Sequence, residues 1–389
     1  MGTRRRSAYR KPLLEQRGPQ LRWAMGSEAV GLEVLSFEET LGKEVVEPGL
    51  CAGCGACVLN CPFWVLGLRE GKPELLEECP ACGVCAYVCP RYKLDLPSIE
   101  GFAFGRARKP DEEFGVVRKM VLARSRDPDV LAVCQDGGLV SSLLIAAIEN
   151  GLVDGAVLSG IKESLPHYPD VRLARTRKEI LACAGSRYSF AEKLVIGLGV
   201  AGGFWLARGD KYAFVGLPCQ IQALRRMQML PNPPVDWSEA IRYAIGLFCT
   251  ETFTYDGLRA YLAEHGLGLA NVDKMNIKAG KLVLRLRSGE ERELPLEPLL
   301  EHRRDGCRTC SDFSAELADI SVGSLGLRGW NIALIRSGRG EELFSAAEEA
   351  GLIDTRPVEE EPRVLRVLRR LTRSKRRRAE AVARARSGN

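Results

Sequence analysis

The feature that most constrains this chain is a cysteine run that occurs twice. Each run has the spacing C-x2-C-x2-C-x3-C, and a proline follows its last cysteine. The first run is Cys51, Cys54, Cys57, Cys61 and Pro62, and the second is Cys79, Cys82, Cys85, Cys89 and Pro90. A tight loop with a thiol at every third residue can surround three corners of a cubane cluster, and the proline turns the chain away after the fourth thiol.

This spacing predicts a module with two [4Fe–4S] clusters of the bacterial ferredoxin type, in which the fourth cysteine of each run binds the other cluster. The first predicted ligand set is therefore Cys51, Cys54, Cys57 and Cys89, and the second is Cys79, Cys82, Cys85 and Cys61. A pair of zinc ribbons is the alternative. It would explain paired C-x2-C knuckles, but neither the third and fourth thiols nor the two prolines.

The overall cysteine content indicates where the protein works. The 389-residue chain holds 14 cysteines and three histidines, and no apolar stretch of a secretory signal follows its charged first residues. In a reducing compartment such cysteines are metal ligands or catalytic thiols rather than disulfides. The longest apolar run, 194–207, is too short to cross a membrane and contains four glycines. We therefore expect a cytoplasmic protein.

The charge is distributed unevenly along the chain. The net charge is +6, but residues 1–24 carry +6 and residues 361–389 carry +9, which leaves −9 on residues 25–360. A nucleic-acid-binding protein would place its cations on the folded body, so no nucleic-acid partner is predicted. The basic ends are expected to be solvated tails or docking arms, and Met25 is a plausible alternative start of the protein.

The rest of the chain predicts an α/β domain behind the cysteine-rich module. We expect a basic, partly disordered segment at 1–44, the two-cluster module at 45–95, a linker at 96–120, an α/β domain at 121–350 and a basic helical tail at 351–389. Within the α/β domain, strands are predicted at 156–158, 212–215 and 243–248, helices at 139–149 and 220–229, and hairpin strands between 272 and 297. The fold class is therefore mixed α+β and α/β.

Several short stretches resemble the family of coenzyme F420 hydrogenase/dehydrogenase beta subunits, in order and rough spacing over residues 45–340. They begin at Gln135, Ala184, Val215, Ile245, Cys307 and Ala318, and read QDGG, AGSRY, VGLPCQ, IGLFCTE, CRTCSDF and ADISVGS, with Gly329 and Trp330 following. The chain departs from the family at Arg187, where lysine is common, and at Leu217, where threonine is common. Arginine keeps the charge but changes its geometry.

The resemblance implies FAD, a further iron–sulfur cluster and hydride exchange with the deazaflavin coenzyme F420. It implies flavin contacts at Gln135, Asp136, Gly137, Gly138, Gly185, Ser186, Arg187, Tyr188, Thr250 and Glu251. On the residues alone, Gly137 and Gly138 before a helix suit an anion at a helix N-terminus, but they equally suit a simple strand-to-helix turn. The Ser186 loop could likewise be only a solvated loop. No side chain is assigned as a catalytic acid or base.

Six cysteines lie outside the doubled run. Cys219 and Cys249 follow predicted strands and Cys307 and Cys310 form another C-x2-C pair, so neighbouring strand ends could bring these four together. On spacing alone a zinc site fits them as well as a third [4Fe–4S] cluster, and the family resemblance favours the cluster. Cys134 and Cys183 are expected to be buried thiols that act as small hydrophobic side chains.

Two further patterns carry alternatives. The run Gly197-x-Gly199-x-x-Gly202 matches a dinucleotide fingerprint. It lacks a convincing preceding strand, and no acidic residue stands about twenty positions on, so we interpret it as part of a packed helix. The tail places Val364, Leu365, Leu368 and Leu371 on one helical face among arginines. Such a helix can lie on the inner face of an anionic membrane or bind an acidic partner, and a frayed, solvated helix is the alternative.

The predicted function is that of an iron–sulfur flavoprotein oxidoreductase. It would exchange electrons between reduced F420 and a partner protein or subunit, with FAD converting an electron pair to single electrons. Two alternatives remain: a relative that uses ferredoxin or another carrier instead of F420, and a flavin-free electron-transfer subunit of a larger complex.

Overall fold

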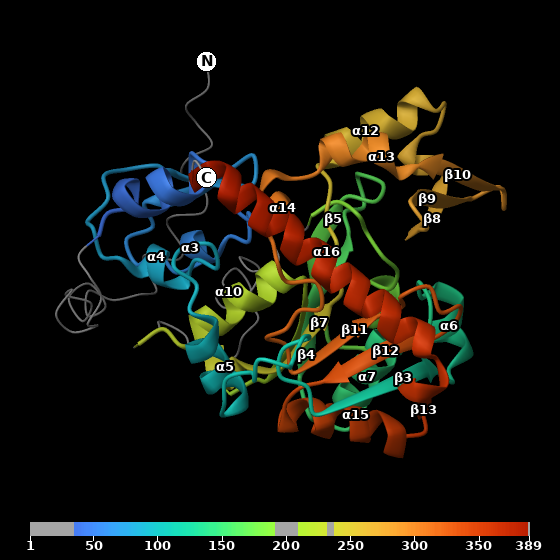
Figure 1. Ribbon diagram of the computed structural model, residues 1–389. Coiled ribbons are helices and arrows are strands. Elements are labelled where there is room, and N and C mark those ends of the chain that lie inside the picture. Colours follow the sequence, from blue (N-terminus) through green and yellow to red (C-terminus); the bar gives the residue numbers. More distant parts are fainter. Residues whose placement is uncertain (1–34, 191–208, 232–236, 388–389) are drawn as a thin grey trace.

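The computed structural model of the chain describes residues 35–190, 209–231 and 237–387 (Figure 1). The basic segment 1–24 and the glycine pattern at 197–202, about which the sequence makes predictions, lie outside these residues. None of the described helices is long and apolar enough to cross a membrane.

The cysteine-rich module consists of short elements between long loops. It contains the π-helix η2 (Glu38–Val46), helices α3 (Ala56–Leu59) and α4 (Val84–Val88), and the antiparallel hairpin β1 (Leu66–Arg69) and β2 (Lys72–Leu75). Helices α3 and α4 begin directly after Gly55 and Gly83, which have φ angles of 81° and 73°. Glycine adopts this left-handed conformation without strain, so each cysteine loop can turn sharply into its helix.

The stretch between module and body contains a helix. Helix α5 (Leu96–Phe104) occupies the first part of the segment 96–120 that we expected to be a linker. The Asp95 side chain caps the helix by accepting a hydrogen bond from the backbone N–H of Ser98. The segment is therefore more ordered than its charged composition indicated.

The body is built on one mixed sheet of eight strands. Its spatial order is β13 (Ile353–Pro357), β3 (Lys119–Ser125), β12 (Asn331–Ile335), β11 (Ile320–Gly323), β7 (Ile241–Leu247), β6 (Tyr212–Gly216), β4 (Gly155–Ile161) and β5 (Pro169–Ala174). Strands β11, β7, β6 and β4 are parallel, and β3 runs in their direction because β12 is antiparallel to both β11 and β3. The carboxyl ends of these five strands therefore meet at one edge, where open α/β sheets bind their ligands.

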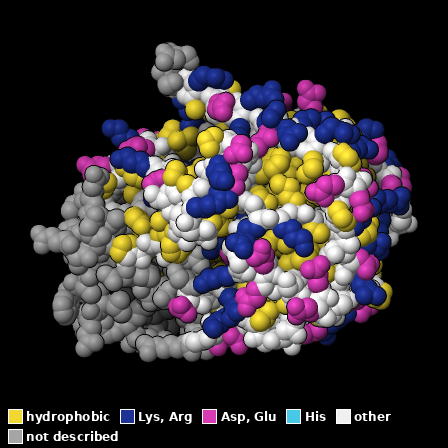
Figure 2. Space-filling view, turned by 60° about the horizontal axis from the view of Figure 1, so that its bottom comes forward, with side chains coloured by type: hydrophobic (Ala, Val, Ile, Leu, Met, Phe, Trp, Pro, Cys, Tyr) yellow, Lys and Arg dark blue, Asp and Glu magenta, His cyan; other side chains and the backbone are white. Residues whose placement is uncertain are grey.

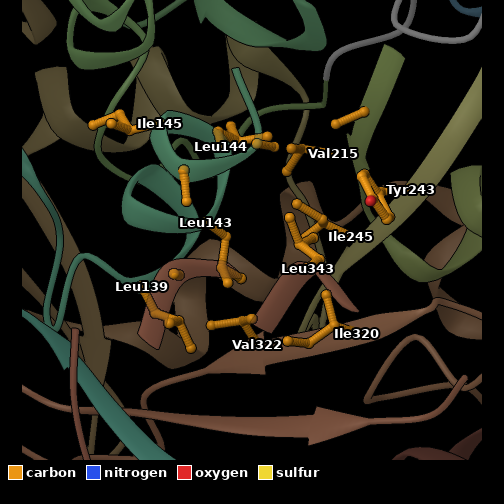
Figure 3. Packing of buried hydrophobic residues seen from close by; sticks show 14 of the residues in the cluster. Leu139, Leu143, Leu144, Ile145, Val215, Tyr243, Ile245, Ile320, Val322 and Leu343 are labelled. Carbon is orange, nitrogen blue, oxygen red and sulfur yellow. The ribbon is translucent and has the colours of Figure 1, made fainter. Parts of the chain in front are cut away.

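Helices cover both faces of this sheet. On one face α7 (Leu139–Glu149) and α15 (Gly338–Glu349) pack on the strands, and Figure 3 shows Leu143 and Leu343 among strand residues such as Ile245 and Val322. On the other face α10 (Pro218–Gln228) shares a core with the module, including Val84 and Val88. The mixed α/β prediction is confirmed, and the helices and strands predicted between 139 and 248 lie within two residues of their observed bounds or inside them.

A smaller unit extends from the carboxyl edge. The antiparallel strands β8 (Val272–Lys278), β9 (Lys281–Leu286) and β10 (Glu291–Pro295) form a three-stranded sheet beside α12 (Tyr255–Glu264) and α13 (Leu296–Leu299). This sheet accounts for the predicted hairpin strands. Shorter helices complete the described chain: α6 (Pro128–Val133), α8 (Arg177–Ala182), α11 (Trp237–Ala240), η3 (Leu269–Asn271), η4 (Leu300–His302), α14 (Asp305–Arg308) and η5 (Val358–Glu360).

The basic tail forms one long helix, α16 (Pro362–Ser387), which crosses the body (Figure 1). Val364 and Leu368 of the predicted apolar face are fully buried and share a core with Phe114 and Phe313. The alternative of a frayed, solvated helix is therefore wrong, because the body covers this face. Because the body buries these apolar side chains, they cannot contact a membrane. The exposed side of α16 is formed largely by arginines.

Candidate functional site

The module brings the first predicted ligand set together. One cavity is lined by Cys51, Cys54, Cys57 and Cys89, three of them from the first run and one from the second. Burial raises the pKa of the Cys54 thiol above its usual value, and the neighbouring thiols of Cys89 and Cys51 raise it further. Such crowding of buried thiols is unfavourable for free thiolates but suits sulfurs bound to one cluster.

The second set is gathered in the same way. Burial raises the pKa of the Cys85 thiol, and so do the neighbouring thiols of Cys82, Cys79 and Cys61. Cys61 is therefore beside the second run, as the predicted exchange of the fourth ligand requires.

Backbone N–H groups point at several of these sulfurs. Gly53 donates to Cys51 Sγ over 3.3 Å, Arg91 to Cys89 Sγ over 3.4 Å and Phe37 to Cys79 Sγ over 3.4 Å. Hydrogen bonds to the sulfurs stabilise their negative charge and so influence the potential of a cluster.

The four cysteines of the proposed third set come from three places along the body. Cys219 lies in the first turn of α10 just after β6, Cys249 follows β7, and Cys307 and Cys310 lie in and after α14. Burial raises the pKa of Cys219 to about 12, and the thiols of Cys310 and Cys307 contribute. The pKa of Cys249 is also raised, by burial and by the other three thiols. The strand ends therefore do bring these four cysteines together.

The spacing of the donors bears on which metal would fit. In the described part of the chain, no three Cys, His, Asp or Glu side chains converge as the ligands of a single metal ion do. A zinc ion needs its thiolates about 2.3 Å from one centre, whereas a cubane binds each thiolate to a different iron and holds them farther apart. A third cluster at these four cysteines therefore stays a prediction.

The third set lies directly against the first. The Cys219 thiol is close enough to Cys54 to raise the pKa of the Cys54 thiol. The Arg304 guanidinium donates a hydrogen bond to the carbonyl of Ala52 over 2.9 Å. Gly306 approaches the Cys51 carbonyl so closely that a Cβ atom there would overlap it. The two sets of ligands are therefore neighbours across the joint between module and body.

Cationic side chains that the sequence analysis did not identify surround the third set. Arg91 reaches from the module to the thiols of Cys310 and Cys219, which together with Cys307 raise the pKa of its guanidinium although burial opposes this. Lys375 of α16 donates to the carbonyl of Cys249 over 2.5 Å. Both residues are far in sequence from the four cysteines of the third set, so no local spacing could have identified them.

The predicted flavin contacts lie at the carboxyl edge of the sheet, but the turn at Gly137 and Gly138 packs on protein. Gly138 starts α7 with φ 73°, and a Cβ at Gly137 would come within 2.6 Å of the side-chain oxygen of Asn331. The same oxygen accepts a hydrogen bond from the Leu139 N–H over 3.1 Å. The first N–H of the helix is thus capped by Asn331, and a flavin contact at this turn stays a prediction.

The loop 185–188 is also held by protein contacts. Arg187 donates to the carbonyls of Cys183, Ala184 and Gly185, while its buried Nε has no partner among the described residues. Tyr188 accepts a hydrogen bond from the Ile277 N–H through its hydroxyl. Arg187 therefore stabilises the loop that follows α8, and its contact with a flavin stays a prediction.

Gln135 joins this loop to the three-stranded sheet. Its side chain donates to the Met275 carbonyl over 2.8 Å and accepts from the Ser186 N–H. The Ser186 side chain itself is exposed, and for its hydroxyl the described residues offer no hydrogen-bond partner.

Arg378 of helix α16 contacts both Thr250 and Glu251. Arg378 donates to the Thr250 carbonyl and pairs with Glu251 over 2.8 Å, and Arg303 pairs with the same carboxylate over 3.1 Å. Glu251 is therefore part of a buried ion-pair network, whereas the Thr250 hydroxyl has no bond among the described residues.

Asp136 is the predicted contact whose chemistry stands out. Burial raises the pKa of its carboxyl group, opposed by a hydrogen bond from Ser324 and by the charges of Lys278 and Lys274. A half-buried carboxyl with two lysines and a hydroxyl is a set of donors and acceptors that a polar ligand can bind. Cys134 is buried nearby and its thiol donates to the Asp136 carbonyl over 3.0 Å; Cys183 is buried as well.

Comparison with known proteins places this architecture in a family. The family is described as "Coenzyme F420 hydrogenase/dehydrogenase": residues 209–361 match the C-terminal part of its beta subunit, and residues 120–196 match the N-terminal part. The chain belongs to this family. Residues 50–94 match a 4Fe-4S dicluster domain, so the ferredoxin-type module is confirmed.

Relatives of this chain include the coenzyme F420 hydrogenase subunit beta of Methanosarcina barkeri. It is 35% identical over 267 residues, which cover 68% of this chain and 90% of the relative. The coenzyme F420-dependent sulfite reductase of Methanocaldococcus jannaschii is 35% identical over 79% of this chain and 47% of its own length. An F(420)H(2) dehydrogenase subunit of Methanosarcina mazei is 29% identical over 79% of this chain and 84% of its own length.

A solved structure shares the fold. A chain of the F420-reducing [NiFe] hydrogenase complex from Methanosarcina barkeri superimposes with a TM-score of 0.67 and 32% identity, covering 72% of this chain and 95% of that chain. The predicted family and oxidoreductase class are thus confirmed. The family match ends at Glu361, so α16 lies beyond it.

Proposed function

We propose that this protein is an electron-transfer subunit that exchanges electrons between reduced coenzyme F420 and a partner protein, with FAD and three [4Fe–4S] clusters as its groups. When bound, a flavin accepts the electron pair of a hydride and gives the electrons up one at a time, and each cluster carries one electron. Reduced F420 would lose two electrons and two protons, and the partner would take up the electrons singly.

The observation that carries the proposal is the contact between the first and third cysteine sets. Cys54 neighbours Cys219 across the joint, and the third set lies at the carboxyl edge where the predicted flavin contacts also lie. This arrangement supports a continuous path for electrons from the edge through the third set to the module. Close spacing of redox groups is what single-electron transfer through a protein requires.

Several side chains at the edge would hold the flavin. The hydroxyls of Ser186 and Thr250 and the buried Nε of Arg187 have no partners among the described residues, and Asp136 lies beside Lys274 and Lys278. These groups are of the kinds that bind phosphates and the polar edge of a ring system. In this proposal Gly137, Gly138, Gln135 and Tyr188 shape the edge through their protein contacts.

A second candidate is an electron-transfer subunit without flavin. It is favoured by the protein contacts of Arg187, Glu251 and Tyr188, three of the side chains predicted to bind FAD. The coenzyme F420-dependent sulfite reductase among the relatives also leaves open which acceptor or donor this chain uses.

The cytoplasmic location and a contact with a membrane stay predictions. On the face shown in Figure 2, Asp and Glu side chains lie among the Lys and Arg side chains.

Anaerobic purification followed by iron, sulfide and flavin analysis tests the proposal. We expect about twelve irons and one FAD per chain, and loss of visible absorbance when reduced F420 is added. About eight irons without flavin would refute the enzyme proposal in favour of the flavin-free subunit. Flavin that reduced F420 does not bleach would retain the flavoprotein and exclude F420 as its donor.

Matched cysteine variants locate the third cluster. Cys307→Ala should remove about four irons and leave the module's signals, whereas Cys57→Ala should alter the module's signals and leave those of the third set. Equal iron contents in Cys307→Ala and the unmodified protein would refute the third cluster. Cys134→Ala is the control, because its thiol lies outside all three sets and should leave the iron content unchanged.

A further inference from the structure

Helix α16 carries a single lysine, and it is buried. Lys375 is 3% exposed although it lies in a helix whose other charged residues are mostly at the surface. Its ammonium donates to the Cys249 carbonyl over 2.5 Å. Taking an ammonium out of water is costly unless negative charge or several hydrogen bonds compensate.

No carboxylate of the described chain supplies that compensation at contact distance. Among the described residues, none forms an ion pair with Lys375, although Arg376 and Arg378 on the same helix pair with Glu316 and Glu251. The groups that act on the ammonium are the thiols of Cys310 and Cys249, then the Asp312 carboxyl and the Cys307 thiol. Together they raise its pKa although burial lowers it.

The cysteines therefore provide the counter-charge only when they are thiolates. Among the described residues, neutral thiols would leave the buried ammonium with the Cys249 carbonyl as its hydrogen-bond acceptor and with the Asp312 carboxyl, which forms no ion pair with it, as a weaker counter-charge. Thiolates bound to an iron–sulfur cluster would give the site a net negative charge, and the reduced cluster is more negative than the oxidised one by one electron. A fixed cation beside such a site favours the reduced state.

We propose that Lys375 sets the redox potential of the third cluster, holding it higher than the four cysteines alone would. This inference rests on the proposed third cluster and concerns a positioning residue, because Lys375 contacts the backbone of a ligand and acts on the cluster through its charge. Arg91 of the module reaches thiols of the same set, and its positive charge should likewise raise the potential of the third cluster.

The position of Lys375 in the fold sharpens the proposal. Helix α16 begins one residue after the family match ends, and Val364 and Leu368 fix it to the body. Helix α16, which lies beyond the matched range, thus covers the third set and places one cation over it. In a relative without such a helix, the corresponding cluster would lack this cation and should have a lower potential.

The test is a redox titration of the full-length protein at pH 8, followed by electron paramagnetic resonance. The third-cluster signal is identified as the one that Cys307→Ala removes. Lys375→Met keeps the length of the side chain and removes its charge, and should shift the midpoint potential of that signal downward. Lys375→Arg restores the charge and should return the potential toward that of the unmodified protein.

Two further variants separate charge from packing. Arg370→Met removes the same charge from an exposed position of α16 and should leave the potential unchanged. Asp312→Asn removes a buried negative group beside the same thiols and should shift the potential upward, opposite to Lys375→Met. If Lys375→Met loses the third cluster, the midpoint potential of Asp312→Asn becomes the test of whether buried charge beside the thiols sets the potential.

The outcomes are distinct. An unshifted third-cluster potential in Lys375→Met with full iron content would overturn the inference and leave the third cluster in place. An unshifted potential in Asp312→Asn would do the same where Lys375→Met has lost its cluster. If the unmodified protein has no signal that Cys307→Ala removes, the proposed third cluster itself fails.

Discussion

The module and the body gather cysteines in two different ways. In the module each set takes three cysteines from one run of seven residues, and the sharp turns at Gly55 and Gly83 form within the run itself. In the body Cys219, Cys249 and the pair Cys307–Cys310 are joined only because β6, β7 and α14 end near one another. A locally encoded site needs little of the fold, whereas an assembled site depends on the whole sheet.

This difference predicts that weakening the body affects the third set first. Arg336, 1% exposed, donates to the carbonyls of Phe114, Val116 and Ser314, and thereby fixes the loop that follows Cys310. Arg336→Met should lower the free energy of unfolding by roughly 3–5 kcal/mol, because it breaks a buried, charged hydrogen-bond network. In urea, the third-cluster signal should disappear before the signals of the module.

The control for Arg336→Met is Arg292→Met. Arg292 is exposed and pairs with Glu290, so its loss should change stability by at most about 0.5 kcal/mol. If Arg336→Met loses all signals at one urea concentration, the two regions unfold together and the contrast between local and assembled sites does not extend to stability.

A second test concerns the helix that covers the assembled site. Leu368 is fully buried between α16 and the body, and Leu368→Ala should cost about 2–5 kcal/mol through the cavity that it leaves. Thermal unfolding measures this cost. Leu76→Ala is the matched control, because Leu76 lies in the module and is 58% exposed. Equal melting temperatures for both variants would mean that α16 does not pack on the body in solution.

The contrast also explains what the sequence could and could not predict. The eight module cysteines and the helix at 139–149 follow from spacing and periodicity over a few residues. Cys219 and Cys249 could be proposed as a pair because parallel strands place their carboxyl ends at one edge. The positions of these strands within the sheet required the structure.

Side-chain direction was the main limit. The sequence assigns Arg187 and Glu251 to a ligand but could not predict their protein partners. Arg187 donates to the carbonyls of the loop after α8, and Glu251 pairs with Arg303 and Arg378. The apolar stripe of α16 was recognised, and its partner was not, since Phe114 and Phe313 are far from it in sequence. Contacts between distant segments leave no periodic signal.

A smaller effect is expected at the joint between the two regions. A Cβ at Gly306 would overlap the Cys51 carbonyl, so Gly306→Ala must move α14 away from the first cysteine loop. Such overpacking costs about 1–3 kcal/mol, and unfolding in urea measures it. The shift should also weaken any magnetic interaction between the first and third clusters in resonance spectra.

Gly101→Ala is the control for this substitution. Gly101 lies in α5 and a Cβ there would meet nothing within 4 Å, so alanine should be neutral or stabilise the helix by up to about 1 kcal/mol. If Gly306→Ala and Gly101→Ala have the same effect, the module and body are not in close contact at Cys51, and the proposed transfer between the two sets loses its structural support.

The smallest effect concerns the surface contacts of α16. Burial raises the pKa of the Glu113 carboxyl, but Arg373 and Arg369 outweigh it and hold this pKa below its usual value. Glu113→Gln should therefore cost at most about 1 kcal/mol, since both arginines are half exposed. A carboxyl whose pKa is lowered by folding stabilises the protein above its unfolded pKa of about 4.5. The difference between the two proteins should be constant near neutral pH, shrink as the pH falls below that value, and decrease with added salt. A difference that persists in acid and in high salt would show that Glu113 acts by packing, and that α16 is held to the body by more than its apolar face and these charges.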